Sequence, residues 1–529
     1  MASRRLARSR PPRRGRLGDT TQPLDRWAVA VMVSLTLALT VLILGGDQAA
    51  ARVRDFSWQQ RQVGAEDRAF VLTFSRPMDR ASVEANLSLS PPLPGKVSWA
   101  GRRMAYTLTE PIPYGQTFSL SLPQASDRFS AQNGKTSGFQ PFQSGFQSRP
   151  RVFLYIGCQG EEANRLVLAN LAQRQRLILT PKNLVVLDFK PYPLGDRVLF
   201  SATDRDRGEA LLNQQLYTVT TGIQIRPPEA LLGDSTAVWR PSDHDSESGQ
   251  LELVLDHRQY QNLKFDLSAD GQVIVVQRVN RQDPTDFGPW VVRSGQEPYR
   301  LETEPGGDFM IAPDSQSLVL LQGEGTAIID LAPDTPAQAG QTLDFLPGYG
   351  QVLDIAADGT AAAMVNFNQN DPKKRFMESL FWVTNQGREE ELLTVSGTIL
   401  DAQFDAHQNF LYVLASELLT EPSQDNLTTE GYVEQPLLLA INLKTQAIIK
   451  LLLLPQRPRI HMSLAPDGRS LLLDLDQEEP QSVKVGRPPP DAAPEIWYLP
   501  LSPASDPSGP QISDPETYPF QGLQATWLP

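Results

Sequence analysis

Short runs in which apolar and polar residues alternate fill most of this chain, and turn residues separate them. Between residues 66 and 123 the runs are AFVLTF (69–74), LSLS (87–90), KVSWA (96–100), MAYTLT (104–109) and QTFSLSL (116–122). A period of two is typical of a strand with one buried face. Pro94-Gly95 and Tyr114-Gly115 supply turns between runs. The pattern predicts a small β-sandwich over residues 55–125, followed by a linker over residues 126–150.

Beyond residue 150 one unit recurs, an apolar strand, a turn often built on Asp-Gly, and a second apolar strand. We expect Asp-Gly to form type I′ turns, which need positive φ at both central residues. We take the second turn residue of each copy as its marker. From one copy to the next, the markers are 76, 44, 44, 49 and 60 positions apart. Blades of β-propellers repeat at about 40–50 residues. These marker residues are Gly195, Gly271, Ser315, Gly359, Gln408 and Gly468.

Six copies, with paired strands at 152–156 and 165–171, predict a β-propeller over residues 151–500. We expect about seven blades, with six or eight possible. The gap of 76 residues holds either a degenerate blade or an insertion around residues 241–249. The Pro-rich tail, residues 501–529, is expected to be irregular.

The longest apolar run lies near the N-terminus. Residues 27–44 carry no charge, and eighteen helical residues extend about 27 Å, close to the thickness of a bilayer. Eight arginines lie in the basic tail before this run, residues 1–26, so the positive-inside rule places the tail in the cytoplasm and the rest outside. The pattern predicts a single-pass transmembrane helix over residues 27–46. A cleaved signal peptide ending near Ala49–Ala51 and a buried core helix are the alternatives.

Composition narrows the class of protein. After residue 51, 40 Lys+Arg stand against 58 Asp+Glu, and such an acidic body argues against nucleic-acid binding. Cys158 is the single cysteine, which excludes an intrachain disulfide and a zinc site built from cysteines. With 36 Gly and 44 Pro, the chain suits a turn-rich all-β protein.

Part of the first β region resembles a known family. Phe74-Ser75-Arg76-Pro77-Met78-Asp79, Ser82-Val83, Gly95-Lys96-Val97-Ser98-Trp99 and Tyr114-Gly115 are similar to the SbsA-type bacterial Ig-like domain. The resemblance covers about 80 residues and implies a spacer or adhesive module on a bacterial cell surface. Met78 and Trp99 are expected to pack in its core.

The repeated turn, AxDG or SPDG between apolar strands, resembles TolB-like and WD-type propellers. It covers nearly all of residues 151–500, and the third and fifth turns, Asp314-Ser315 and His407-Gln408, depart from it. The resemblance implies a fold, and propellers of this kind include both binding proteins and enzymes.

The sequence contains no G-x-S-x-G, P-loop, dinucleotide or H-E-x-x-H motif. His244, His257, His407 and His461 are not spaced as zinc ligands, and we expect His461 to be a packed core residue. Solvated acidic loops are expected around His244 and at Asp204, and Asp266 and Asp270 are assigned to a blade turn rather than a calcium loop. Cys158 is expected to be a small buried residue. No catalytic, cofactor-binding or metal-binding residue is therefore assigned, and no cofactor is expected. The acidic loop residues are Asp243, Asp245 and Glu247 around His244, and Asp204, Asp206 and Glu209.

These patterns predict a bacterial plasma-membrane protein whose Ig-like domain presents a propeller in the periplasm or outside the cell. The expected partners are the lipid bilayer, through residues 27–44, and an envelope protein or polysaccharide. The expected function is binding without catalysis. The alternative is an exported hydrolase or lyase with an active site in the propeller channel, built from carboxylates of separate blades.

Overall fold

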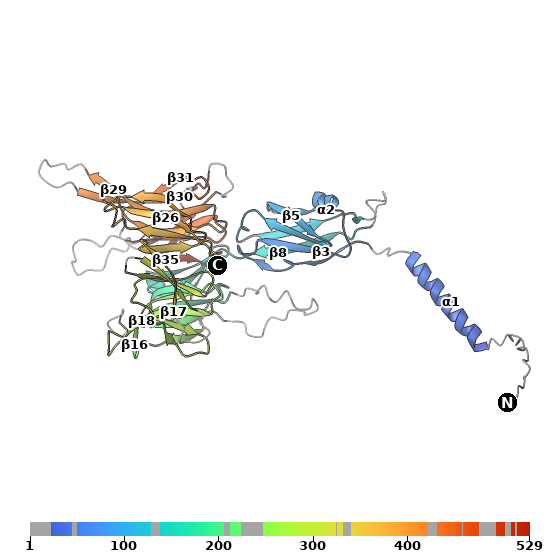
Figure 1. Cartoon of the computed structure of the whole chain (residues 1–529), viewed down its shortest axis with the longest axis horizontal. Helices are drawn as coiled ribbons and strands as arrows, with labels where there is room; N and C mark the ends of the chain where they lie inside the picture. The colour runs from blue at the N-terminus through green and yellow to red at the C-terminus, as the bar shows by residue number, and fades with distance from the viewer. Residues whose placement is uncertain are drawn as a thin grey trace, which may run out of the picture.

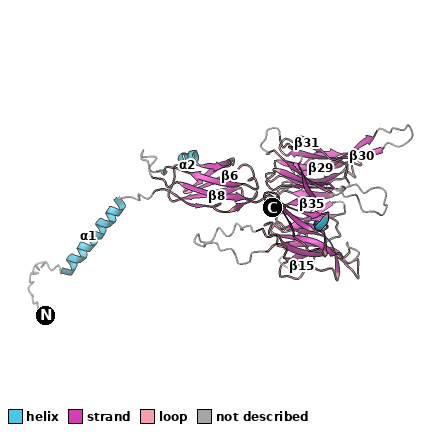
Figure 2. Cartoon of the chain, turned by 180° about the vertical axis from the view of Figure 1, so that it is seen from behind, coloured by secondary structure: helices cyan, strands magenta, loops and turns pink. Residues whose placement is uncertain are grey.

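The computed structural model describes residues 23–44, 50–128, 138–205, 212–223, 247–323, 325–331, 340–421, 431–457, 459–475, 494–502, 509–513 and 516–529. Strands make up most of these residues (Figure 2). The chain runs from helix α1 (Pro23–Leu44) through a β-sandwich into a larger ring of sheets (Figure 1).

The sandwich consists of two four-stranded sheets around one hydrophobic core. Phe56, Trp58, Phe70, Phe118 and Phe146 are nearly fully buried in this core, and their rings contact one another across it. A short helix, α2 (Arg80–Asn86), begins at Asp79, whose carboxylate caps Ser82 N at 3.1 Å. The first sheet has the order β1 (Val53–Phe56), β3 (Ala69–Phe74), β6 (Arg103–Leu108), β5 (Gly95–Ala100), and the second β2 (Gln62–Val63), β8 (Phe142–Ser148), β7 (Thr117–Leu122), β4 (Ser88–Ser90).

The larger part of the chain forms a β-propeller. Five of its blades are separate four-stranded antiparallel sheets, in which each strand pairs with the next along the chain. They are blade 2, β12 (Leu184–Pro191), β13 (Arg197–Asp204), β14 (Gln215–Thr220), β15 (Leu251–Leu255); blade 3, β16 (Tyr260–Leu267), β17 (Val273–Asn280), β18 (Phe287–Arg293), β19 (Tyr299–Arg300); blade 4, β20 (Phe309–Ile311), β21 (Ser317–Gln322), β22 (Gly325–Asp330), β23 (Thr342–Pro347); blade 5, β24 (Gln351–Ile355), β25 (Ala361–Asn366), β26 (Glu378–Thr384), β27 (Glu389–Val395); and blade 6, β28 (Ile399–Phe404), β29 (Phe410–Glu421), β30 (Gly431–Asn442), β31 (Ile448–Leu453).

The C-terminal strand β35 (Glu516–Trp527) joins the two ends of the propeller. Its first half pairs with β34, and its second half, from Gly522, pairs with β9. The described residues therefore form seven blades, and β35 closes the ring. Blade 7 contains β32 (Ile460–Leu464), β33 (Ser470–Leu475) and β34 (Glu495–Pro500), and blade 1 contains β9 (Val152–Gly157), β10 (Leu166–Asn170) and β11 (Gln175–Ile178), with the helical turn η1 (Gly160–Glu162) between β9 and β10.

Two details of the sequence interpretation need correction. The tail expected to be irregular contains β35, because Phe520, Leu523, Ala525 and Trp527 give it an apolar face that packs on blades 1 and 7. The Asp-Gly turns are not type I′, since φ is positive at Gly271 but not at Asp270. In every copy the marker residue donates its N–H to the carbonyl three residues earlier, which is a type I turn followed by one left-handed residue.

The predicted transmembrane helix is the third correction. Residues 23–44 do form α1, and its side chains from Trp27 to Ala38 are exposed. The apolar run is interrupted by Ser34, Thr36 and Thr40, whose hydroxyls donate to helix carbonyls. Within the part of the chain that the structure describes, no helix combines the length and apolarity needed to cross a membrane. The structure therefore gives the predicted anchor over residues 27–46 no support.

The sandwich is attached to one side of the propeller, at the turns of blades 6 and 7 (Figure 1). Asp467 Oδ2 accepts from Tyr114 N at 2.9 Å, and Arg469 forms an ion pair with Glu110 at 3.3 Å. Arg68 donates to the carbonyl of Ala406 at 3.0 Å. These contacts fix the sandwich against the face that carries the Asp-Gly turns.

Candidate active site

The first strand of each of blades 2 to 7 places two side chains toward the axis of the propeller. Counted back from the marker residue of each turn, these are the residues seven and five positions earlier. Residues two apart in a regular strand share a face, so both point the same way, except in blade 5, where a register shift lies between Val352 and Asp354. In chain order the pairs are Asp188 and Lys190, Lys264 and Asp266, Asp308 and Met310, Val352 and Asp354, Asp401 and Gln403, and His461 and Ser463.

Four of these side chains accept a hydrogen bond from the backbone of the neighbouring blade. The Asp266 carboxylate accepts from Ile311 N at 2.8 Å, and the Asp354 carboxylate accepts from Phe404 N at 2.8 Å. In the same way, Gln403 accepts from Leu464 N at 2.8 Å. Ser463 accepts from Trp527 N at 3.1 Å. Register shifts next to Asp188, Asp354 and Asp401 mark β-bulges, which turn side chains toward the axis.

Seven charged or ionisable residues meet at the axis, and we call them the axial cluster. Blades 2 and 3 contribute cations and carboxylates, whereas blades 5, 6 and 7 contribute carboxylates and a histidine. Water reaches this cluster, because the side chains of Lys190 and His461 are 47 % and 40 % exposed. The axial cluster consists of Asp188, Lys190, Lys264, Asp266, Asp354, Asp401 and His461.

Lys190 is the cation at the middle of the cluster. Its Nζ lies 3.3 Å from Asp266 Oδ1, across the boundary between blades 2 and 3. The negative charge of Asp266 raises the pKa of Lys190 despite the opposing effect of burial, and Asp188 and Asp354 add to the rise. Lys190 is therefore a fixed positive charge at neutral pH. Lys264, in contrast, has its pKa lowered, mainly by burial.

Within the axial cluster, Asp354 and Asp401 are the two carboxyl groups whose pKa values are shifted most from that of an ordinary aspartate. Burial, with a smaller contribution from the neighbouring charge of Asp401, raises the pKa of Asp354 to about 7, although hydrogen bonds from Phe404 N and Ile355 N oppose the rise. Burial raises the pKa of Asp401 to about 6, although His461, Gln403 and Lys190 oppose this. Both groups therefore exchange protons near neutral pH, unlike an ordinary aspartate.

His461 lies beside these carboxyl groups. Its Nδ1 is 3.2 Å from Oδ1 of the buried Asp474, a residue of β33. Burial lowers the pKa of His461, but the hydrogen bond and charge of Asp474, with the charges of Asp401 and Asp188, outweigh it and raise the pKa above its usual value. The prediction of a packed core histidine is thus wrong, since the side chain of His461 is 40 % exposed.

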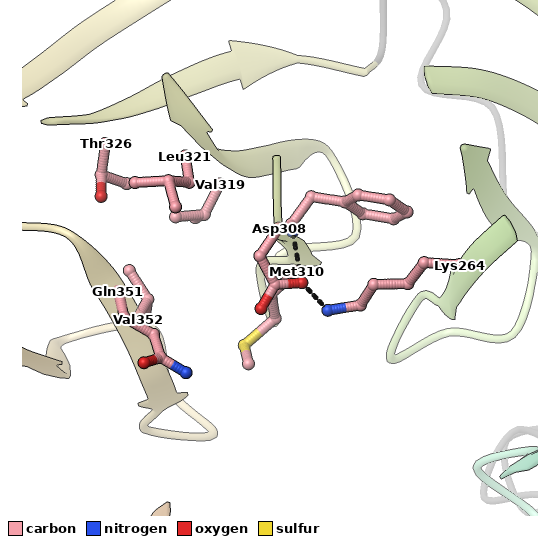
Figure 3. Close-up of a pocket in the computed structure, with 9 residues that line it drawn as sticks. Lys264, Asp308, Met310, Val319, Leu321, Thr326, Gln351 and Val352 are labelled. Atoms are coloured by element: carbon pink, nitrogen blue, oxygen red, sulfur yellow. Dashed lines mark hydrogen bonds and ion pairs between the residues drawn. The ribbon is translucent and has the colours of Figure 1, made fainter. Parts of the chain in front are cut away.

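A small pocket of about 40 Å³ adjoins the axial cluster between blades 4 and 5 (Figure 3). Met310 occupies the position at which other blades carry a polar joining residue, so this boundary lacks that hydrogen bond. Lys264 reaches across from blade 3 to form an ion pair with Asp308 at the pocket's edge. The pocket is also lined by Phe309, Val319, Leu321, Thr326, Gln351 and Val352.

Most residues weighed from the sequence lie away from this cluster. Met78 is buried in the sandwich core, as expected, and Trp99 packs against that core and donates to Glu84 at 2.8 Å. Cys158 is half-buried rather than fully buried, because it lies just beyond the end of β9. Asp270 does lie in its turn, but Asp266 belongs to β16 and forms the ion pair with Lys190.

Of the remaining histidines and acidic loop residues, those that the structure describes lie away from the axial cluster. His257 Nδ1 lies 2.6 Å from Gln215, and His407 lies in the turn of blade 6, where burial lowers its pKa. His244, Asp243, Asp245, Asp206 and Glu209 lie outside the described residues, whereas Asp204 ends β13 and Glu247 is exposed. Among the described residues, no three His, Cys, Asp or Glu side chains come together as metal ligands would.

Sequence reasoning found the repeat but missed the axial cluster. The missing signal was the column of residues seven and five positions before each turn marker. A strand buried on both faces is expected to be apolar there. Instead, this column holds eight charged or ionisable residues in twelve positions, the seven of the axial cluster and Asp308.

Comparison of this chain with known proteins finds similar solved structures. No family model and no curated protein matches the chain. Among solved structures, it is similar to the periplasmic gluconolactonase of Pseudomonas aeruginosa, at 13 % identity and a TM-score of 0.41, covering 72 % of this chain and 99 % of that one. An oligogalacturonate lyase in complex with manganese matches at 11 % identity and a TM-score of 0.40, and the match covers 64 % of this chain and 82 % of the lyase. TolB from Acinetobacter baumannii matches at 10 % identity and a TM-score of 0.36, and the match covers 84 % of this chain and 83 % of TolB.

These comparisons correct the expectation of a protein without catalysis. Two of the three similar structures are enzymes by their own descriptions, a gluconolactonase and a lyase. At such low identities no residue role passes from them to this chain. What the axial cluster does has to be argued from its own side chains.

Proposed function

We propose that the protein is an enzyme, a hydrolase or lyase, whose active site is the axial cluster. The observation that carries the proposal is the pair Asp354 and Asp401, two carboxyl groups on neighbouring blades with pKa values of about 7 and about 6. Catalytic acids and bases need pKa values near the working pH, and such values gather at functional sites.

The two carboxyl groups would take opposite roles. Near pH 6.5 Asp354 is mostly protonated and Asp401 mostly ionised, although each titrates under the influence of the other. In hydrolysis, Asp401 accepts a proton from water while the water oxygen bonds to the substrate carbon, and Asp354 donates a proton to the leaving oxygen. In elimination, Asp401 instead accepts a proton from a carbon beside a carbonyl group, a C=C bond forms as the C–O bond to the leaving oxygen breaks, and Asp354 protonates that oxygen. Lys190, held by Asp266, stabilises negative charge that develops on the substrate.

The charge of the cluster indicates the kind of substrate. Near pH 6.5, with Asp354 mostly protonated, its three other carboxyl groups face two lysines and His461, so the cluster offers little net positive charge to attract a strongly anionic substrate. Carboxylates accept hydrogen bonds from hydroxyl and amine groups. An uncharged polysaccharide of the cell envelope, rich in hydroxyl donors, therefore fits the cluster better than a polyanion.

We also infer that the propeller works outside the cytoplasm, and that α1 associates with the lipid bilayer. The eight arginines within residues 1–26 and the exposed apolar side chains of α1 support this location. Protease added to intact spheroplasts should digest the propeller. A propeller that is digested only after lysis would contradict the location without affecting the proposed chemistry.

The proposed activity is tested by turnover of defined chromogenic substrates. The full-length protein in neutral detergent would be assayed on p-nitrophenyl glycosides and esters and on neutral polysaccharides. We expect a bell-shaped pH dependence with its maximum between pH 6 and 7, and a loss of about 10²- to 10⁴-fold in kcat for Asp354→Asn or Asp401→Asn.

A matched control is Asp344→Asn. Asp344 also accepts a hydrogen bond from the N–H of the next residue, at 2.8 Å, but it is exposed on the outer strand β23. Its activity should equal that of the wild type. Absence of turnover on the whole panel, or full activity in both axial variants, would overturn the proposal.

A further inference from the structure

Four exposed arginines gather at the end of the sandwich where the chain arrives from α1, and we call this group the arginine end. Ser75 joins two of them, because Ser75 N donates to Arg52 O at 2.9 Å and Arg102 donates to Ser75 O at 3.3 Å. Arg103 of β6 pairs with Thr73 of β3. The next residue of β3, Phe74, pairs with Val53 at the start of β1. The arginine end consists of Arg52, Arg54, Arg102 and Arg103.

Carboxylates do not neutralise the arginine end. Within the described residues, Arg54 and Arg103 make no side-chain hydrogen bond or ion pair. Of the nearby acids, Asp79 caps α2 and Asp127 lies 3.9 Å from Arg76. Asp55, which is exposed, is the one remaining acid on β1, so the arginine end keeps a net positive charge.

An open hollow of about 460 Å³ lies at this end of the sandwich. Arg52 and Arg54 line it with the amide of Gln140, and Phe142 provides an apolar wall. Its size lies within the usual range for small-ligand pockets, roughly 300–1,000 Å³. Guanidinium and amide donors beside an apolar wall are the chemistry that recognises a phosphate attached to an apolar group.

The arginine end is also close to α1 along the chain. Arg52 lies eight positions after Leu44 in the chain, so the two are at most about 29 Å apart even when the chain is fully extended. The side chains of α1 from Trp27 to Ala38 are exposed and almost all apolar. An apolar helix followed directly by a basic surface matches a bilayer with anionic headgroups.

We propose that the arginine end binds the headgroup phosphates of anionic phospholipids. Binding there would hold the sandwich against the membrane surface and set the orientation of the propeller above it. This inference does not depend on the proposed enzymatic activity, since it involves other residues and another domain.

The experiment counts lipids retained by the full-length protein in neutral detergent micelles, using native mass spectrometry. Micelles would contain phosphatidylglycerol, phosphatidylcholine or neither, and a separate titration would use inorganic phosphate. We expect phosphatidylglycerol to be retained over phosphatidylcholine, and retention to weaken as salt rises. Replacing Arg54 and Arg103 by Gln should weaken phosphatidylglycerol binding about 25-fold, at about fivefold for each arginine.

The control variant is Arg174→Gln with Arg258→Gln, two exposed arginines on the propeller. It removes the same charge and should bind phosphatidylglycerol like the wild type. A second variant, Arg52→Gln with Arg102→Gln, tests the same site should the first lose its circular dichroism spectrum. Equal retention of both lipids, equal losses in the test and control variants, or displacement by millimolar phosphate would each overturn the assignment to lipid.

Discussion

His461 Nδ1 lies 3.2 Å from Asp474 Oδ1, and the same carboxylate holds the strand that closes the propeller. Asp474 Oδ2 accepts from Gln524 N at 2.8 Å, and its other oxygen accepts from Ala525 N at 3.3 Å. Asp474 is only 5 % exposed, so these interactions are little screened by water. One residue of the axial cluster is thus connected directly to the closure of the ring.

This relationship predicts a pH-dependent stability for the wild type relative to His461→Gln. The folded-state pKa of His461 is raised, so its protonation favours the folded state below the unfolded value, near 6.5. Asp474, Asp401 and Asp188 are the groups that face it. The melting temperature of the wild type should exceed that of the variant at pH 5.5, and this difference should shrink as the pH rises through the folded pKa. A constant difference from pH 5.5 to 9 would contradict the assignment.

Asp354 predicts a trend of the same sign, a wild-type stability that falls as pH rises, but it arises from burial of a carboxyl group rather than from protonation of a histidine. Its folded-state pKa of about 7 lies above the unfolded value near 3.9, because burial disfavours the charged form. Ionisation therefore destabilises the folded state, and stability falls as pH rises from about 4 to 7. Asp354→Asn lacks this ionisation, so its melting temperature relative to the wild type should rise between pH 4 and pH 8. Calorimetric scans at both pH values measure the change, and Asp344→Asn should show none of it.

Local patterns in the sequence predicted local structure well. The strand expected at residues 69–74 is β3 with the same bounds, because alternation and flanking turns determine a half-buried strand. Ser315 and Gln408 were departures from the Asp-Gly pattern, yet both have positive φ, 60° and 54°, as Gly271 does. The hydrogen bond to the carbonyl three residues earlier keeps the turn even where glycine is missing.

What the sequence did not reveal depends on contacts between distant residues. The pKa of Asp354 follows from burial beside β28, which begins 45 residues later. The strand β35 went unnoticed because it completes two blades at once and its partner β9 lies more than 350 residues earlier. Such pairings follow from closing the ring, and no local pattern records them.

Closure of the ring predicts a large effect for Trp527→Ala. Trp527 is 5 % exposed, and its ring lies 5.8 Å from that of Phe153 and 6.2 Å from that of Tyr498. It therefore packs against both blade 1 and blade 7. Removing a buried Trp typically costs about 3–5 kcal/mol, so the propeller should unfold at clearly lower urea concentration. Phe376→Ala removes an aromatic residue that is 85 % exposed and should leave the midpoint unchanged.

The contact between Asp467 and Tyr114 predicts how firmly the sandwich is held on the propeller. Asp467 Oδ2 accepts from the buried Tyr114 N at 2.9 Å, while Oδ1 accepts from Arg469 N within its own turn at 3.1 Å. Asp467→Ala leaves the Tyr114 N–H without this acceptor, at a cost of about 1–3 kcal/mol. Because that cost exceeds thermal energy, the variant should show relative motion of the two domains.

Spin labels on Ser88→Cys and Gln175→Cys, in a Cys158→Ser background, report the distance between sandwich and propeller. The wild-type distance distribution should be narrow, and that of Asp467→Ala should be broader. Asp270→Ala is the matched control, because Asp270 precedes Gly271 as Asp467 precedes Gly468 and likewise accepts from the residue two positions later, at 2.9 Å. Asp270 lies on blade 3, whereas the described contacts of the sandwich with propeller turns are with those of blades 6 and 7. Equal broadening in both variants would show that loss of the turn, rather than loss of the contact with Tyr114, releases the sandwich.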